Sequence, residues 1–261
     1  YGFAVLDEHG NPLPVDAMAT QLLSLARARL PHLNDVSSNG IFIQNASRLY
    51  VDAGYHPELA GCECTNPWDV VRYMLAGDRI LSSLATALES TLPPGSQVFV
   101  FKTNVDHGGK GVTWGSHESQ LHRVDPLLLP PQLIPHLVSR VIYCGAGGFR
   151  NNSAGLQFLV SPRAAHIEHV LSSSSTAARG IFHTKDETLS TKGYHRLHII
   201  CGESLSSHRA AWLRMATTSL VTAMAEAGLR PGDAVELASP LEALRAFAAD
   251  PDLAALVPGA R

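Results

Sequence analysis

The sequence predicts an α+β fold in which a mixed, largely antiparallel sheet is backed by helices on one side. Segments with strand and helix patterns interleave along the chain, but without the regular period of about 30 residues that βαβ units show. No internal repeat is visible, which argues against a solenoid or propeller. The 261 residues are enough for one large domain or two modest ones.

The first third of the chain predicts two helices and one stretch of strand. Residues 15–29 place apolar side chains at helical spacing. Residues 41–52 have the alternation of two short strands or one bulged strand. Residues 66–91 begin with a proline and continue as a long amphipathic pattern, so we expect a helix there, weakened once at Gly77.

The remaining two thirds predict several short strands between helices. We expect strands at 96–106, 155–163, 180–184 and 194–202, helices at 132–144, 206–228 and 239–249, a glycine-rich turn at 107–111, a helix-breaking segment at 145–148 and a loop at 172–175. The helix over 206–228 opens on serine and closes on Gly228. Its expected apolar face consists of Trp212, Ala216, Leu220, Ala223 and Ala227.

Composition describes an ordinary globular protein with 45% hydrophobic and 16% charged residues. A net charge of −3 gives no general attraction to nucleic acid or to an anionic membrane, so we expect neither partner. No apolar run reaches the roughly 18 residues of a spanning helix, and we expect no signal peptide.

Four cysteines point to a reducing compartment and to structural roles. Cys62 and Cys64 form C-x-C without a second pair that would complete a zinc site. Cys144 and Cys201 lie in apolar, strand-like contexts, where a thiol behaves as a small hydrophobic group. We therefore expect a cytoplasmic protein.

The stretch from Arg48 to Asp52 concentrates polar groups on one face of a strand. Because side chains alternate, Arg48, Tyr50 and Asp52 share one face while Leu49 and Val51 enter the core. The alternative is a solvent-facing strand on which arginine and aspartate form a surface pair worth about 0–1 kcal/mol.

Two further predicted strands repeat this arrangement. Lys102, Asn104 and Asp106 share a face, and so do Arg196 and His198. Several polar faces together favour a shared cleft. A satisfied core histidine at 198 and a solvated edge lysine at 102 remain the alternatives.

A metal site is suggested by Glu58 and Glu63, which follow Asp52 on a loop that carries proline and glycine. Few carboxylates on rigidly turned backbone suit Mg²⁺ held together with nucleotide phosphates. No Walker A or GxGxxG motif is present, and the glycines at 145–148 are too short and wrongly flanked to form a dinucleotide loop.

Five segments, in this order, resemble the signature segments of one enzyme family: NASRLYVDAGYHPELAGCEC, FKTNVDHGGKGVTWGSHES, RVIYCGAGG, SPRAAHIEHVLSSSST and HTKDETLSTKGYHRLHIICGESLS. They are similar to the Pup ligase and Pup deamidase/depupylase family of glutamine-synthetase-like carboxylate–amine ligases. The resemblance covers the chain from end to end. It is closer to the ligase, because the spacing of DAGYHPE matches that form and no room precedes Asp52 for the long loop of the depupylase.

The resemblance implies a curved, mainly antiparallel sheet that cradles ATP and Mg²⁺. It implies Asp52 as catalytic base, Arg48 as an ATP contact, and Tyr50 and Glu58 as metal-site positions. Arg196 and His198 match a segment that reaches the nucleotide and its metals, so we expect Arg196 to contact the cofactor and His198 to contact the metal. From their shared polar face, we also expect Lys102 and Asn104 to contact the cofactor.

The implied function is an ATP- and Mg²⁺-dependent ligase that activates a glutamyl side-chain carboxylate as an acyl phosphate and joins it to an amine. The inherited partners would be Pup, or another glutamate-bearing acid, and a protein lysine or small amine. Three alternatives stay open: a deamidase or depupylase, a divergent ligase acting on a non-Pup substrate, and an inactive binding module.

Four segments depart from the family pattern, namely those at 117–120, 161–164, 184–188 and 202–205. Where the family has HENY, SQRA, TRDEP and GDSN, this chain has HESQ, SPRA, TKDET and GESL. These changes spare the expected site residues and favour a retained nucleotide site with an altered acceptor side.

The resemblance also predicts the domain organisation. Residues 1–230 would form the catalytic domain without its first-strand glutamates, one of which is a metal ligand in the family. Residues 231–261 would begin a C-terminal region whose remainder, with an aromatic residue that packs on the nucleotide, lies outside this sequence. We therefore expect a fragment or one part of an assembly.

Overall fold

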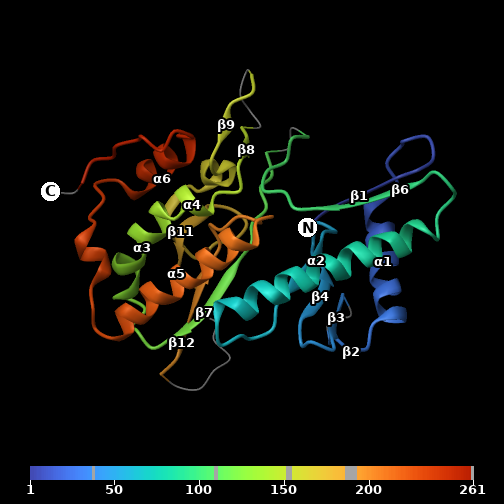
Figure 1. Cartoon of the computed structure of the whole chain (residues 1–261), viewed down its shortest axis with the longest axis horizontal. Coiled ribbons are helices and arrows are strands. Elements are labelled where there is room, and N and C mark those ends of the chain that lie inside the picture. Colours follow the sequence, from blue (N-terminus) through green and yellow to red (C-terminus); the bar gives the residue numbers. More distant parts are fainter. Residues whose placement is uncertain (37–38, 109–110, 151–154, 186–192, 260–261) are drawn as a thin grey trace. The chain divides into compact units, whose positions relative to one another are not determined.

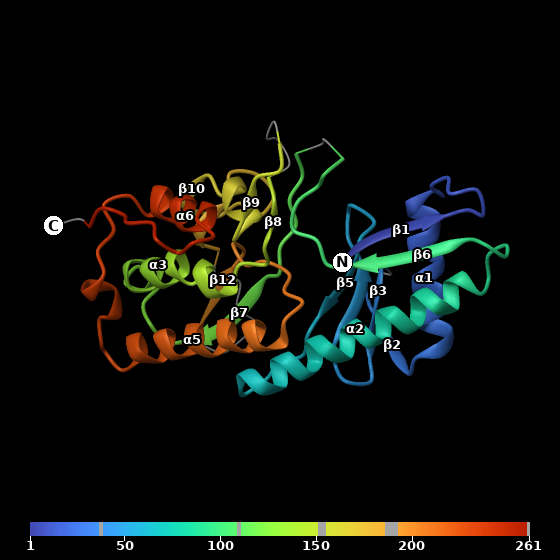
Figure 2. The ribbon, with the colours of Figure 1, turned by 45° about the horizontal axis from the view of Figure 1, so that its top comes forward.

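Short antiparallel strands and long helices form the part of the chain that the computed structural model describes, residues 1–36, 39–108, 111–150, 155–185 and 193–259. The chain divides into two compact units, Tyr1–Lys102 and Thr103–Arg261. Figures 1 and 2 show the elements of each unit.

The first unit consists of a four-stranded sheet, a two-stranded ribbon and two helices. Its elements are β1 (Gly2–Leu6), α1 (Val15–Arg29), β2 (His32–Asn34), β3 (Gly40–Ile43), β4 (Arg48–Val51), β5 (Pro57–Ala60), α2 (Pro67–Glu89) and β6 (Gln97–Phe101). The sheet has the order β2-β3-β4-β5, and β1 pairs with β6, all antiparallel. Helices α1 and α2 pack together, and the core between them and the strands includes Leu22, Ile41, Leu49, Leu81 and Leu88.

Helix α2 begins where the local sequence satisfies its first backbone amides. The Asn66 side chain accepts a hydrogen bond from the Asp69 amide, and Pro67 occupies the first turn. Close packing explains the glycine at position 77 inside the helix, because a Cβ there would lie 2.2 Å from Cδ2 of Leu59 on β5. The predicted helices over 15–29 and 66–91 are therefore confirmed.

The second unit contains a mixed four-stranded sheet covered by helices. Its elements are β7 (Glu118–His122), α3 (Leu129–Ser139), α4 (Val141–Cys144), β8 (Gly148–Phe149), β9 (Phe158–Leu159), η1 (Pro162–His166), β10 (His169–Ser172), β11 (Gly180–His183), β12 (His195–Ile199), α5 (His208–Glu226), η2 (Pro231–Ala234) and α6 (Pro240–Ala249). The sheet order is β10-β11-β12-β7, in which only β10 and β11 are parallel among the described strands. The short strands β8 and β9 form a separate pair.

Helix α5 confirms the predicted position but not the predicted buried face. The Ser207 side chain caps it by accepting from the Ala210 amide. Its buried residues are Ala211, Arg214, Thr218 and Thr222, whereas Leu220 is 62% exposed. The apolar face expected from Trp212 to Ala227 is wrong because the buried side meets charged groups of the core.

Three strand predictions need correction. Residues 57–60, expected as loop, form β5. The strand expected over 96–106 ends at Phe101, and the one expected over 155–163 shrinks to Phe158–Leu159. Residues 41–52 form two short strands, the first of the two expected arrangements.

Residues 231–259 pack into the second unit. Ala243, Leu244 and Ala248 of α6 belong to the same hydrophobic core as Leu133 and Leu137 of α3. The assignment of residues 1–230 and 231–261 to two family domains stays a prediction. Among the described residues, no helix combines the length and apolar character needed to cross a membrane.

Candidate functional site

The hairpin of β4 and β5 builds the polar face of the first unit. Tyr50 pairs in register with Glu58, and its hydroxyl donates a hydrogen bond to Oε2 of that carboxylate. Burial, followed by the neighbouring Glu58 carboxylate, raises the pKa of Tyr50, so the phenol stays protonated. Leu49, on the opposite face, is 2% exposed, which confirms the predicted alternation.

Arg48 is held in place by Asp35 and not by Asp52, its partner in the alternative of a surface pair. Its Nη2 lies 2.5 Å from Asp35 Oδ2, its Nε donates to the same oxygen, and Nη2 also donates to Asn39 at 3.2 Å. Its guanidinium carbon lies 4.2 Å from the centroid of the Tyr50 ring. The side chain is therefore oriented by three neighbours rather than paired with Asp52.

Asp52 lies one residue beyond β4, in the turn that leads to β5. Its Oδ1 accepts hydrogen bonds from the amides of Gly54, at 2.9 Å, and His56, at 2.8 Å. These bonds orient the carboxylate, which lies close enough to Tyr50 to influence that phenol. The structure thus brings Tyr50, Asp52 and Glu58 together, although Asp52 does not belong to the strand.

Lys102 and Asn104 do not share a strand face as predicted, because β6 ends at Phe101. Lys102, the last residue of the first unit, forms a 2.7 Å ion pair with Asp78 of α2. Asn104 belongs to the second unit, where its amide donates to the Ser204 carbonyl and accepts from the Ser204 amide. These contacts give both residues structural roles, and their assignment to a cofactor stays a prediction.

A row of polar side chains crosses the sheet of the second unit. His183 of β11 pairs in register with His198 of β12, which pairs in turn with Ser119 of β7. The His183 and His198 ring centroids lie 5.1 Å apart, and those of His117 and His198 lie 5.2 Å apart, both edge to face. Arg196 lies beside His198 and bonds to it.

Sequence reasoning identifies Arg196 and His198 but misses the other members of this row. His117 and Ser119 belong to a segment that stands out in the sequence only as a departure from the family pattern, and β7 is not among the predicted strands. His183 is 3% exposed and lies at the end of the predicted strand 180–184. The predicted strand 180–184 shows no polar alternation, because Ile181 precedes His183 on the same face, so its pattern gives no signal for this residue.

A buried ion-pair network holds β7 in place beneath this row. Glu118 accepts hydrogen bonds from both Nη atoms of Arg140, at 3.1 and 2.8 Å, and lies 3.5 Å from Nε of Arg214. All three residues are at most 2% exposed. Burial alone would raise the pKa of Glu118, but Arg140 and then Arg214 outweigh it and lower the pKa.

Arg163 and Glu203 are buried beside the same sheet. The Arg163 guanidinium donates to the Ile200 carbonyl and to Thr113, and burial lowers its pKa to about 10. Glu203 accepts from the amides of Ala146 and Arg163. The row over this sheet therefore offers arginine and histidine side chains, while the carboxylates of Glu118 and Glu203 are satisfied within the core.

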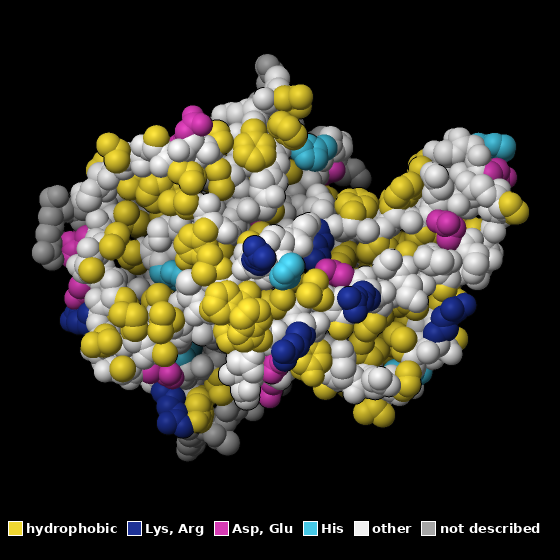
Figure 3. Space-filling model, viewed as in Figure 1, with side chains coloured by type: hydrophobic (Ala, Val, Ile, Leu, Met, Phe, Trp, Pro, Cys, Tyr) yellow, Lys and Arg dark blue, Asp and Glu magenta, His cyan; other side chains and the backbone are white. Residues whose placement is uncertain are grey.

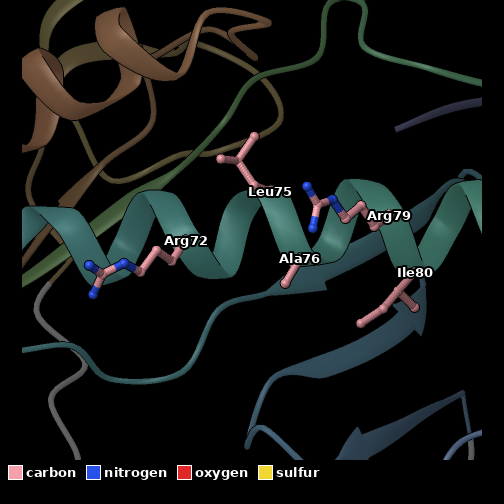
Figure 4. Close-up of a pocket in the computed structure, with 5 residues that line it drawn as sticks. All are labelled: Arg72, Leu75, Ala76, Arg79 and Ile80. Carbon is pink, nitrogen blue, oxygen red and sulfur yellow. The ribbon is translucent and has the colours of Figure 1, made fainter.

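Elsewhere on the described residues, we find no further grouping of the side chains predicted to bind the nucleotide or metal. On the face shown in Figure 3, the lysine and arginine side chains of the described residues are interspersed with acidic, histidine and hydrophobic side chains. A shallow pocket runs along α2 and is lined by Arg72, Leu75, Ala76, Arg79 and Ile80 (Figure 4). It contains none of the predicted site residues.

The residues of the first unit fit a weakly held Mg²⁺ only in part. Glu58 offers one carboxylate, which suits an ion that keeps several waters and shares nucleotide phosphates. Tyr50 is a protonated phenol bonded to Glu58, so it positions that carboxylate rather than providing a phenolate ligand. Among the described residues, no three His, Cys, Asp or Glu side chains cluster as a metal site.

Curated relatives are Pup--protein ligases. The chain is 37% identical to that of Corynebacterium diphtheriae over 84% of its length, 35% to that of Corynebacterium jeikeium over 96%, and 39% to that of Acidimicrobium ferrooxidans over 83%. It spans 46%, 53% and 48% of these relatives, about half of their length.

Solved structures show the same likeness. The ligase PafA in its complex with the prokaryotic ubiquitin-like protein Pup superposes with a TM-score of 0.78 at 32% identity, over 95% of this chain and 50% of the other. PafA in complex with ADP gives a TM-score of 0.74 at 31% identity, over 95% and 53%. These neighbours confirm the predicted glutamine-synthetase-like α+β fold.

The Pup-ligase protein family model matches residues 7–261. Because that match spans nearly the whole sequence and agrees with the relatives and the fold, the chain belongs to the Pup-ligase protein family.

Proposed function

We propose that this chain carries the chemistry of an ATP-dependent Pup–protein ligase. The reaction would activate a glutamyl side-chain carboxylate with ATP and join it to a protein lysine as an isopeptide. The relatives are named Pup--protein ligases, and one structural neighbour holds ADP while another holds Pup. The proposed partners are therefore Pup, or a similar glutamate-bearing acid, and an amine.

One observation carries the proposal: β4, β5 and their turn place a guanidinium, a phenol and two carboxylates side by side. Arg48 is oriented by Asp35 and Tyr50, Glu58 by Tyr50, and Asp52 by two backbone amides. Such preorganised groups suit phosphoryl transfer, in which positioning and electrostatics supply most of the catalysis.

Each group has a chemical task in this reaction. Arg48 would contact phosphate oxygens through a guanidinium whose orientation is already set. Glu58 would hold Mg²⁺, which neutralises developing phosphate charge when bound. Asp52 would accept a proton from the attacking amine, since deprotonating a free lysine at neutral pH costs about 4–5 kcal/mol.

Asp52→Asn provides the test of this assignment. The amide keeps the shape of the side chain but cannot act as a base, so we expect ADP to bind as in the parent while isopeptide formation falls at least roughly 100-fold. The measurement uses the full-length protein with Mg²⁺, ATP, Pup and a lysine acceptor. Conjugates are followed on gels, and ADP affinity is followed by calorimetry.

Two results would reject the proposal. Undiminished conjugation by Asp52→Asn would remove Asp52 from the mechanism. A parent protein that binds ADP but releases free Pup from a conjugate, without consuming ATP and without making isopeptide, would assign it to the hydrolase alternative. Asp125→Asn serves as the matched control, because this aspartate lies in an exposed turn of the second unit.

A further inference from the structure

The hydrogen bonds around His198 close into a triangle with one consistent direction. Arg196 Nη2 lies 2.9 Å from His198 Nδ1, Arg196 Nε donates to Ser119 Oγ at 3.1 Å, and Ser119 Oγ lies 3.3 Å from His198 Nδ1. A guanidinium can only donate, so Nδ1 must be the acceptor. Ser119 accepts from Arg196 and is thereby left to donate its own hydroxyl to Nδ1.

This direction decides where a neutral imidazole carries its proton. With Nδ1 accepting, the proton of His198 resides on Nε2. The neighbouring His183 obeys the same rule, because the Lys185 amide donates to its Nδ1 at 3.2 Å. Adjacent imidazoles of the row thus carry their protons on the same kind of nitrogen.

That arrangement is the reverse of what a metal site needs. A histidine that binds a metal through Nε2 has its lone pair there and donates from Nδ1 to a carboxylate, carbonyl or water. Here Nδ1 faces a cation that cannot accept a hydrogen bond. The described residues also contain no cluster of three potential ligands. His198 therefore does not fit the metal role that the family resemblance predicts.

The ring is also held firmly in this orientation. His117 and His183 pack their rings edge to face against it, with interplanar angles of 89° in both pairs. Strand pairing places Ser119 directly opposite His198. Beneath Ser119, the adjoining Glu118 is anchored by Arg140, so β7 cannot move without breaking a buried ion pair.

We propose that His198 is a hydrogen-bond donor to an anionic oxygen through Nε2–H, and that Ser119 and Arg196 are the positioning residues that hold it in this tautomer. A phosphoryl or carboxylate oxygen is the ligand chemistry that a protonated Nε2 beside an arginine recognises. The inference deepens the proposed function by assuming that this face meets the nucleotide. The assignment of the tautomer stands independently of turnover.

Nitrogen NMR on the ¹⁵N-histidine-labelled chain tests the tautomer directly. His198→Gln identifies the resonances, and we expect an unprotonated Nδ1 and a protonated Nε2. Arg196→Met removes the donor and should shift the tautomer ratio toward Nδ1–H by roughly 10- to 100-fold. Arg179→Met, which removes a positive charge that acts on His117 of the same row, should leave the ratio unchanged.

Added Zn²⁺, followed by Mg²⁺, distinguishes donor from ligand. We expect the His198 nitrogens to keep their tautomer with either metal. Conversion to Nδ1–H with a metal-shifted Nε2 would overturn the proposal, as would a parent spectrum that already shows Nδ1–H. None of these readouts depends on catalysis, so a protein without ligase activity can still confirm or reject the tautomer.

Two substitutions extend the test to nucleotide binding in the full-length protein. His198→Gln keeps an N–H donor, whereas His198→Asp keeps a metal ligand and removes the donor. We expect ADP affinity within about threefold of the parent for the glutamine variant, and a loss of roughly 10- to 100-fold for the aspartate variant. The reverse order would identify His198 as a metal ligand. Thermal melts confirm that both variants fold.

Discussion

Tyr50 shows how far alternation along a strand can predict a site. The pattern of residues 48–52 places its ring opposite buried Leu49, and the structure agrees. The pattern does not reveal that Glu58 lies across from it, because that pairing depends on β5. The chemistry of the pair arises from this contact: a protonated phenol orients a carboxylate.

Tyr50→Phe tests the contact at the scale of one hydroxyl. The change removes the donor to Glu58 but keeps the ring under Arg48. The residues that hydrogen-bond to metal-binding carboxylates typically contribute 10- to 100-fold to metal affinity. With Glu58 in its proposed role, we therefore expect the Mg²⁺ concentration for half-maximal activity to rise about tenfold. Stability should fall by about 1 kcal/mol.

The matched control is Tyr55→Phe, a tyrosine of the neighbouring turn that is 47% exposed. This substitution should change neither the Mg²⁺ concentration for half-maximal activity nor the stability measurably. An unchanged Mg²⁺ requirement in the Tyr50→Phe variant would show that the phenol does not position Glu58 for the proposed Mg²⁺ site.

At the scale of elements, helices are predictable from the sequence and strand ends are not. Helices α1, α2 and α5 are recognisable by their period and, for α2 and α5, by a side-chain cap, all of which are local. The ends of a short strand such as β4, by contrast, depend on where its pairing with the neighbouring strand stops, which the local sequence does not show. This is why the sequence pattern places Glu58 on a loop, and Lys102 and Asn104 on a strand.

Gly40 on β3 controls the room available to the β4 site. A Cβ at this position would lie 2.7 Å from Tyr50 Cβ and 3.2 Å from Asp35 Oδ2. Gly40→Ala should therefore separate β3 from β4, with a loss of about 1–3 kcal/mol in the free energy of unfolding. Urea unfolding followed by the fluorescence of Trp68 measures it.

Gly61→Ala is the control for that substitution. Gly61 follows β5, and a Cβ added there would meet no atom within 4 Å, so the stability should change by no more than about 0.5 kcal/mol. Equal effects of the two substitutions would show that the close approach at Gly40 does not limit the fold.

The Glu118 network predicts a large effect from a small change. Glu118→Gln would leave Arg140 and Arg214 buried without a countercharge, and the loss of one partner of a buried pair typically costs about 3–5 kcal/mol. Denaturant unfolding followed by Trp212 fluorescence measures this cost. Arg72→Ala, which breaks an exposed pair with Asp69, should cost less than about 1 kcal/mol. Similar costs for both would contradict the role assigned to burial.

On the scale of the whole molecule, each unit has its own hydrophobic core. The second core surrounds groups that titrate. Burial, reinforced by Arg140, lowers the pKa of His136 to about 4, and its Nε2 lies 3.0 Å from Thr218 Oγ1. Between pH 6.5 and 4 the unfolded chain therefore binds a proton that the folded unit excludes.

The contribution of neutral His136 to the free energy of unfolding of the second unit should therefore be fully present above pH 6.5. It should be lost as the pH falls toward 4. This contribution amounts to at most about 3 kcal/mol. Glutamine at this position can keep the bond to Thr218 without titrating, so His136→Gln should flatten the profile. Unfolding measured from about pH 7.5 to about pH 4.5 checks it, with the exposed His9→Gln as control. If His136→Gln leaves the dependence of stability on pH unchanged, groups other than His136 cause the loss of stability at low pH.

The sequence by itself determined the long helices α1, α2 and α5, the α+β class, the family and the polar face that begins at Arg48. The helix expected over 132–144 is instead divided into α3 and α4. Period, caps and signature segments are local properties, readable without knowing what lies across the chain. Only the tertiary structure decided that Glu58 sits on a strand against Tyr50, that Asn104 is engaged by Ser204, and that Ser119, Arg196 and His198 form one row. Apart from the local bond between Arg196 and His198, these contacts join residues 8 to 100 positions apart, and pairing over such separations depends on the packing of whole units.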